Sequence, residues 1–256
     1  GEGEHERRGA APQQGEPHRP GDLHARVLGL LGDVHGRLEA VEDVDRREYG
    51  VCADCGGEVE AFRLEVQPVA QVCLGCISAE ERARLEDDLF LASKIHRALL
   101  PQTAANIPGF TIGVQSAAAQ FVGGDYYDFL TTANGTSLVV VADCMGKGVS
   151  AGLLMSNVQG AIRVLAEGID SPARLVARLN RWLSRNVPVT KFVSLACVAV
   201  YPNEDGSARL VYANAGHCPP LVVRTNGSPE TLGPPGAGLG IQDGVDYPEA
   251  EVRMAP

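Results

Sequence analysis

The stretch that most constrains the fold of this chain is 138–151, Leu-Val-Val-Val-Ala-Asp-Cys-Met-Gly-Lys-Gly-Val-Ser-Ala. Its β-branched start predicts a buried strand, and the apolar run after its two glycines predicts a helix. A lone carboxylate, Asp143, stands where the strand ends. We expect this acid to have a partner or a ligand, because an unpaired buried charge is costly.

A partner for Asp143 follows from the turn at 133–136, Ala-Asn-Gly-Thr. Asn-Gly between two strand-like runs is the strongest short-range hairpin signal. With Asn-Gly as a two-residue loop, Asp143 faces Tyr126, and Asp125 is one step away. Strict alternation would turn Asp125 to the other face, so we expect Gly123-Gly124 to supply a bulge that re-aims it.

Two carboxylates at the open end of one hairpin predict a cation site. Two ionised acids so placed repel each other and raise one pKa. Hard oxygen ligands favour Mg²⁺ or Mn²⁺, and two such ions about 3.5 to 4 Å apart could share a hydroxide. The alternative is that Asp125 caps a turn and Asp143 caps the following helix.

A rival interpretation concerns Gly-Lys-Gly-Val-Ser-Ala at 146–151, which fits the dinucleotide fingerprint G-x-G-x-x-A. A βαβ unit needs a strand after the helix, but 171–187 has helical periodicity. Asp143 would also lie close to the pyrophosphate. We therefore disfavour nucleotide binding.

Two C-x-x-C pairs predict a zinc site. The four thiolates suit tetrahedral zinc, and four protein ligands leave no place for substrate, so the site should be structural. A redox dithiol is the alternative. The pairs are Cys52 with Cys55, and Cys73 with Cys76. Together with the flanking sequence over 47–81, the two pairs resemble the DksA/TraR-type zinc finger. The long two-helix arm of DksA is not evident in this sequence.

The segments around this finger predict a tail and two helices. Residues 1–22 are polar and rich in Gly and Pro, so we expect a disordered tail. Val27, Leu31, Val34, Leu38 and Val41 predict a helix over 23–47. A coiled-coil helix over 78–101 is predicted from a capping box, Ser78 with Glu81, a terminating Pro101 and a seam. The seam residues are Leu85, Leu89, Ala92, His96 and Leu99. We expect 78–100 to form a homodimer.

Composition limits the partners. The net charge of −10 argues against non-specific binding to nucleic acid or anionic membranes, which need a basic face. We find neither the roughly 18 uninterrupted apolar residues of a spanning helix nor a signal-peptide pattern. We therefore expect a cytoplasmic protein with no nucleic-acid or membrane partner.

Four motifs make the expectation more specific. They are Asp-Asp-Leu-Phe-Leu-Ala-Ser-Lys-Ile-His-Arg-Ala-Leu-Leu-Pro at 87–101, Val-Gly-Gly-Asp-Tyr-Tyr-Asp at 122–128, Ala-Asp-Cys-Met-Gly-Lys-Gly-Val-Ser-Ala at 142–151 and Asn-Ala-Gly-His-Cys-Pro-Pro at 214–220. In content and order they resemble the SpoIIE/RsbU-like phosphatases, which belong to the metal-dependent PPM (type 2C) protein phosphatases. The resemblance covers roughly the segment from Asp87 to Pro256.

The resemblance implies an α+β fold over 102–256, a sandwich of two antiparallel sheets flanked by helices. It implies two Mn or Mg ions, in addition to the one structural Zn of the finger at 48–77. The implied site residues are Asp125 and Asp143 as bridging carboxylates, the backbone carbonyl of Cys144 as a ligand, and Gly146, Gly148 and His217 on loops at the site. Asp128 is expected behind the metal ligands or bound to a metal through water. For His217 a purely structural role is the alternative.

The implied reaction is hydrolysis of phosphoserine or phosphothreonine, with a phosphorylated anti-anti-sigma factor as substrate. Family members continue with further metal-binding aspartates after the point where the printed sequence ends. The resemblance therefore implies that this sequence carries two of four metal carboxylates, and that full activity belongs to a longer chain. The alternative is a non-enzymatic zinc-finger regulator that uses a degenerate phosphatase fold to bind proteins.

Overall fold

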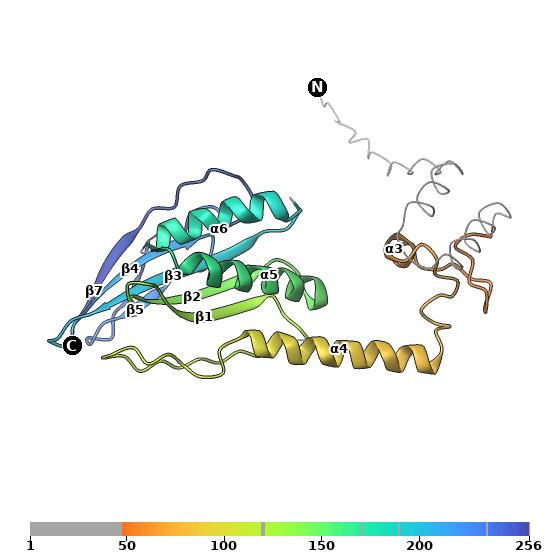
Figure 1. Cartoon of the computed structure of the whole chain (residues 1–256), viewed down its shortest axis with the longest axis horizontal. Coiled ribbons are helices and arrows are strands. Elements are labelled where there is room, and N and C mark those ends of the chain that lie inside the picture. Colours follow the sequence, from red (N-terminus) through yellow and green to blue (C-terminus); the bar gives the residue numbers. More distant parts are fainter. Residues whose placement is uncertain (1–47, 119–120, 170, 189, 234, 256) are drawn as a thin grey trace, which may run out of the picture. The chain divides into compact units, whose positions relative to one another are not determined.

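The computed structural model describes residues 48–118, 121–169, 171–188, 190–233 and 235–255. The expected tail (1–22) and first helix (23–47) lie outside the described residues. The chain divides into two compact units, Gly1–Leu85 and Glu86–Pro256, each described by itself (Figure 1). The division falls inside one helix, α4, which runs from Ala79 to Leu99.

The first unit contains the cysteine pairs and the short helix α3 (Ala61–Val66). An isolated antiparallel bridge joins Val51 to Glu58, which folds the first C-x-x-C segment back on itself. The N–H of Cys52 also donates to the carbonyl oxygen of Gly57 at 2.7 Å. Short backbone contacts of this kind suit a segment whose main support is a metal ion.

Helix α4 begins and ends as predicted, but one residue of its predicted coiled-coil seam, His96, packs against its own domain. Ser78 Oγ accepts a hydrogen bond from the N–H of Glu81 at 3.0 Å, which confirms the N-cap. His96, expected as a polar residue of a coiled-coil seam, is buried within the second unit. Its Nε2 lies 2.9 Å from the carbonyl oxygen of Gly123. The prediction for His96 is therefore wrong, because this contact places it against its own domain.

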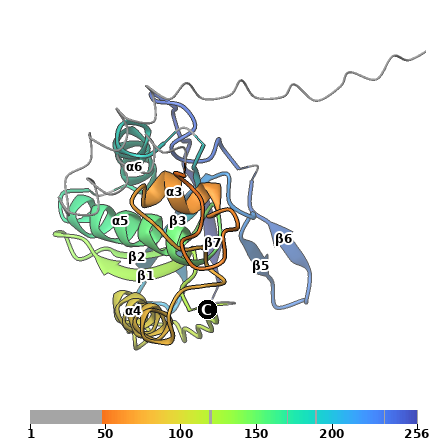
Figure 2. The same cartoon turned by 90° about the vertical axis from the view of Figure 1, so that its right-hand side faces the viewer.

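The second unit is built on a five-stranded antiparallel sheet in the order β1-β2-β3-β4-β7. Its strands are β1 (Asp125–Thr131), β2 (Ser137–Cys144), β3 (Val193–Pro202), β4 (Ala208–Ala215) and β7 (Ala250–Met254). A separate two-stranded ribbon is formed by β5 (Leu221–Val223) and β6 (Pro229–Thr231) (Figure 2). Val222 of this ribbon packs in one buried cluster with Tyr212 and Val252 of the sheet. The α+β class, with an antiparallel sheet and flanking helices, is confirmed.

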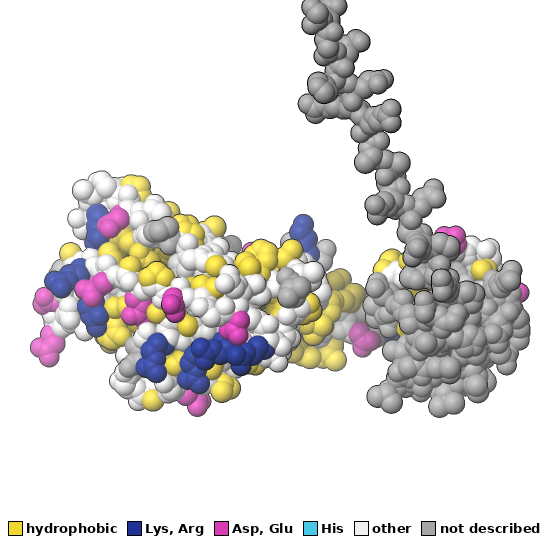
Figure 3. All heavy atoms as spheres, turned by 90° about the horizontal axis from the view of Figure 1, so that it is seen from above, with side chains coloured by type: hydrophobic (Ala, Val, Ile, Leu, Met, Phe, Trp, Pro, Cys, Tyr) yellow, Lys and Arg dark blue, Asp and Glu magenta, His cyan; other side chains and the backbone are white. Residues whose placement is uncertain are grey.

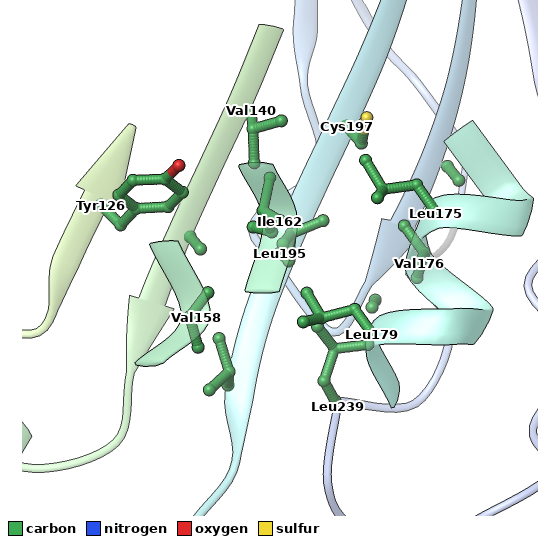
Figure 4. Close-up of a cluster of buried hydrophobic side chains, with 14 of the residues drawn as sticks. Tyr126, Val140, Val158, Ile162, Leu175, Val176, Leu179, Leu195, Cys197 and Leu239 are labelled. Carbon is green, nitrogen blue, oxygen red and sulfur yellow. The ribbon is translucent and has the colours of Figure 1, made fainter. Parts of the chain in front are cut away.

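Two helices that the sequence predicted, α5 (Gly148–Ala166) and α6 (Pro172–Asn186), cover one face of this sheet. The core lies between them and the sheet, where Tyr126 and Val140 meet Val158, Ile162 and Leu179 (Figure 4). Among the described residues α5 alone is long and apolar enough to span a membrane. Its buried side chains belong to this core, as expected for a core helix of a globular domain.

Helix α6 separates apolar from basic residues. Leu175, Val176, Leu179 and Leu183 are buried, whereas the four arginines of the helix, Arg174, Arg178, Arg181 and Arg185, are exposed. Lys and Arg side chains gather in a band on the face seen in Figure 3. A local basic surface thus exists on a chain whose net charge is −10.

Strand-like sequences precede β1 at 110–114 and 117–122. The described residues between 110 and 122 form no strand, because they pair with no neighbouring strand in the part of the chain that the structure covers. Of the two sheets of the expected sandwich, the described residues therefore form one sheet of five strands, and their remaining strands form the ribbon β5–β6.

The hairpin β1–β2 has a longer loop than predicted. Its last pair is Thr131 with Ser137, so the loop is 132–136 rather than Asn-Gly alone. The Thr132 side chain explains this, because its hydroxyl contacts Asn134 Oδ1 and accepts from the N–H of Thr136 at 3.1 Å. The register therefore moves by one residue, and Asp143 pairs with Asp125 rather than with Tyr126.

Candidate active site

The two acids of the hairpin lie directly opposite each other. Asp125, the first residue of β1, is the Cα partner of Asp143 in β2. Opposite residues of an antiparallel pair point to the same face. Both are exposed. The strand register alone thus brings the two carboxylates together. The bulge that was expected at Gly123-Gly124 is not needed for this.

The row of side chains continues onto a third strand. Ser194 in β3 is the partner of Asp143 on its other side, so Asp125, Asp143 and Ser194 form one line across three strands. Sequence reasoning missed Ser194. The available signal was a hydroxyl residue near the start of an otherwise apolar strand.

The electrostatics of the acid pair suit a cation. Burial raises the pKa of Asp143, the negative charge of Asp125 raises it further, and His217 opposes this shift. Like charges directly opposite each other destabilise a sheet. Hard divalent cations bind carboxylate oxygens and remove such repulsion. The donor set therefore fits a hard divalent cation such as Mg²⁺ or Mn²⁺.

The backbone beside the acids is packed closely. A Cβ at Gly124 would collide with the carbonyl oxygen of Cys144, so only glycine fits there. The N–H of Cys144 donates to the carbonyl oxygen of Gly124 at 3.1 Å. These contacts hold the Cys144 carbonyl next to the peptide that precedes Asp125.

The glycine turn after Asp143 leads into α5. Gly146 and Gly148 have φ values of 122° and 64°, which favour glycine. The N–H of Met145 donates to the carbonyl oxygen of Phe192 at 3.0 Å, which anchors the turn to the start of β3. Because α5 is followed by α6 and not by a strand, the dinucleotide interpretation of this turn is excluded.

His217 lies at the same site. Together with Asp125 and Asp143 it lines a hollow of about 530 Å³. Its Nδ1 is 2.9 Å from Ser194 Oγ. Burial lowers the pKa of His217, and the charges of the two acids oppose this lowering.

The loop that carries His217 is held by Asn214. The Asn214 side chain accepts from the N–H of His217 at 2.9 Å and donates to its carbonyl oxygen at 3.0 Å. Gly216 has a φ of 68°, and a Cβ there would lie 3.0 Å from the backbone of Gly238. The backbone of His217 is thus held by the two hydrogen bonds with the Asn214 side chain.

Asp128 does not belong to this site. It is buried, 1% exposed, on the helix-covered face, because it is three residues from Asp125 in an alternating strand. Its carboxylate accepts hydrogen bonds from Arg163 Nε at 2.8 Å and from Tyr126 Oη at 2.7 Å. The second-shell role expected for Asp128 is therefore wrong. Arg163 was missed, since no local pattern links residues so distant in sequence.

The four cysteines of the finger come together. The Sγ atoms of Cys52, Cys55, Cys73 and Cys76 all lie within 4.8 Å of one another. The N–H of Cys73 donates to Cys52 Sγ at 3.3 Å, and this bond is the main cause that lowers the pKa of Cys52 to about 6. Thiolates in such a cluster fit the ligand set of zinc.

Comparison with known structures defines the class of the second unit. The SiaA-PP2C domain of Pseudomonas aeruginosa matches with a TM-score of 0.56 and 26% sequence identity, over 70% of this chain and 71% of that chain. The sheet and its two covering helices thus resemble the fold of a PP2C domain.

Sequence comparisons define the family more narrowly. Residues 133–256 match the model of Stage II sporulation protein E (SpoIIE). Phosphoserine phosphatase RsbU of Bacillus subtilis is 28% identical over 172 residues, which are 66% of this chain and 50% of RsbU. RsbP of the same organism is 24% identical, over 62% of this chain and 40% of RsbP. The second unit is thus similar to the SpoIIE/RsbU-like phosphatases. The chain spans half or less of the length of these relatives.

The finger has relatives of its own. The RNA polymerase-binding transcription factor DksA of Escherichia coli is 36% identical over 56 residues, which are 22% of this chain and 35% of DksA. The similarity thus covers a small part of both proteins.

Proposed function

We propose that this protein is a metal-dependent phosphatase of phosphoserine or phosphothreonine in proteins. The observation that carries the proposal is the direct pairing of Asp125 with Asp143 on the open face of a PP2C-type sheet. The similarity to RsbU and RsbP, both named phosphoserine phosphatases, supports the same reaction.

The proposed ligands of two Mn or Mg ions are the carboxylates of Asp125 and Asp143 and the carbonyl oxygen of Cys144. When bound, such ions supply an activated water and hold phosphate oxygens during in-line attack. The chain contributes a rigid frame for these ligands. Gly124 lets the two strand ends approach, because a Cβ there would collide with the carbonyl oxygen of Cys144.

The proposed substrate is a phosphorylated anti-anti-sigma factor in bacterial partner switching, in the cytoplasm. The proposal for this substrate rests on the similarity to RsbU. Because the proposed reaction removes phosphate from phosphoserine or phosphothreonine in proteins, the substrate is a phosphorylated protein. We propose one structural Zn in the finger, bound by the four cysteines, and a homodimer through helix α4. No nucleic-acid partner is proposed.

The test is phosphate release from a phosphoserine peptide by the protein purified from its complete reading frame, with and without Mn²⁺. We expect Mn²⁺-dependent turnover that Asp143→Asn reduces by about two orders of magnitude or more. Asp246→Asn is the matched control, since Asp246 is an exposed acid remote in sequence from the site. Absence of Mn²⁺-dependent turnover in the unmodified protein would favour the non-enzymatic regulator instead.

A further inference from the structure

The imidazole of His217 has one committed nitrogen and one uncommitted nitrogen. Nδ1 is paired with the hydroxyl of Ser194, and Nε2 has no hydrogen-bond partner among the described residues. Ser194 stands in the same row as Asp143, so this contact fixes the ring beside the acid pair. His217, whose Nε2 is unpaired within the described part of the chain, therefore lines the same hollow as Asp125 and Asp143.

The tyrosine hydroxyls among the residues that line this hollow are already used. Tyr127 Oη donates to the carbonyl oxygen of Pro101 at 3.0 Å, and Tyr126 Oη donates to Asp128. Asp125 and Asp143 are assigned to the cations. Among the described residues that line the hollow, His217 is thus the group left to exchange a proton near neutral pH.

We propose that His217 is a catalytic residue that protonates the leaving oxygen of the phosphorylated side chain; this inference rests on the proposed phosphatase function. As water attacks phosphorus, the P–O bond to the serine breaks and its electron pair passes to the serine Oγ. The Nε2–H of the imidazolium gives its proton to that oxygen. Serine and inorganic phosphate leave, and the imidazole recovers a proton from the attacking water through solvent.

Two neighbours position this donor. Ser194 Oγ is paired with Nδ1, which leaves Nε2 for the substrate, and the Asn214 side chain holds the N–H and the carbonyl oxygen of His217. Asp125 and Asp143 are the charged groups that act on the ring. Positioned general acids contribute about 10²- to 10⁴-fold to a reaction, and only where the leaving group needs a proton.

The test compares two substrates in the protein from its complete reading frame with Mn²⁺. The phosphoserine peptide releases a strongly basic alkoxide, whereas p-nitrophenyl phosphate releases a phenolate that leaves without a proton. For His217→Gln we expect kcat on the peptide to fall about 100-fold or more, and kcat on p-nitrophenyl phosphate to change by less than about 3-fold. Ser194→Ala should show the same selectivity with a smaller loss on the peptide.

Two further measurements separate this role from a structural one. The Mn²⁺ affinity of His217→Gln, measured by calorimetry, should equal that of the unmodified protein, and its melting temperature should be unchanged. Cys218→Ser, at the exposed neighbouring residue, is the control. Equal losses on both substrates, no loss on either, or weakened Mn²⁺ binding would each overturn the inference. No turnover of either substrate by the unmodified protein would instead refute the proposed function.

Discussion

Arg163 in α5 holds Asp128 in β1 through two hydrogen bonds, from Nε to Oδ2 at 2.8 Å and from Nη2 to Oδ1 at 3.2 Å. Tyr126 and the N–H of Phe129 complete the set around the same carboxylate. This network lies beneath the sheet, on the face opposite to Asp125. It fastens α5 to the strand that carries Asp125.

Replacing Arg163 with Met should destabilise the second unit. The carboxylate of Asp128 would remain buried without its cation, and we expect a loss of about 2 kcal/mol because Arg163 itself is half exposed. Urea unfolding followed by circular dichroism measures this change. Arg178→Met, at an exposed arginine of α6, should change stability by less than about 0.5 kcal/mol. Equal effects of the two substitutions would contradict the role of the pair.

The stability of the metal-free protein should depend on the ionisation of Asp143. Its pKa is raised above the ordinary 3.8 in the folded state. The folded state therefore binds the proton more tightly than the unfolded state, and stability falls as pH rises from 3.8 through the raised pKa.

Urea unfolding in buffer free of Mn²⁺ and Mg²⁺ tests this dependence. Asp143→Asn should lose this part of the pH dependence and be more stable than the unmodified protein above the raised pKa. Adding Mn²⁺ should reverse the order, because the ion stabilises only the protein that binds it. A pH profile that is identical in the two proteins would refute the repulsion between Asp125 and Asp143.

Gly124→Ala should damage the metal site. The added Cβ collides with the carbonyl oxygen of Cys144, so the strand ends must separate and the two acids must move apart. We expect at least about 10-fold weaker Mn²⁺ binding in calorimetry. Gly160→Ala is the matched control, because that glycine lies in α5 with open space around it. It should raise stability by about 0.5 to 1 kcal/mol and leave Mn²⁺ binding unchanged.

Zinc removal should unfold the finger and spare the phosphatase domain. Cys76→Ser removes one of four thiolates, and we expect the zinc content measured by mass spectrometry to fall from one ion per chain to near zero. Amide exchange should then increase within 48–77 and stay unchanged in the second unit, because the two are separate compact units. Cys218→Ser should retain zinc. Loss of exchange protection in β1 to β4 would argue against this independence.

Dimerisation through α4 should depend on its exposed apolar side chains. Leu91 and Ile95, both 55% exposed, lie one turn apart on this helix. Ile95→Glu keeps a good helix former and should shift the sedimentation coefficient from dimer to monomer. Val164→Glu, at a residue of α5 that is 74% exposed, should leave the dimer intact. A monomeric unmodified protein would exclude the homodimer.

Local patterns were sufficient to predict several parts of this molecule. The alternation of β1 and β2, the apolar periodicity of α5 and α6, and the N-cap at Ser78 are encoded within a few residues of one another, so the sequence alone predicted them. The two C-x-x-C pairs likewise predicted a thiol cluster before any coordinates. Convergence of Asp125 and Asp143 at one hairpin end was predicted for the same reason.

Tertiary structure decided the contacts between distant segments. The side chain of Thr132 lengthens the hairpin loop and moves the register by one residue, which places Asp125 directly opposite Asp143. A shift of one residue exchanges the faces of a strand, and turn composition alone does not determine it. The partners Arg163 for Asp128, Ser194 for His217 and Gly123 for His96 are set by packing across the sheet, which no local periodicity records.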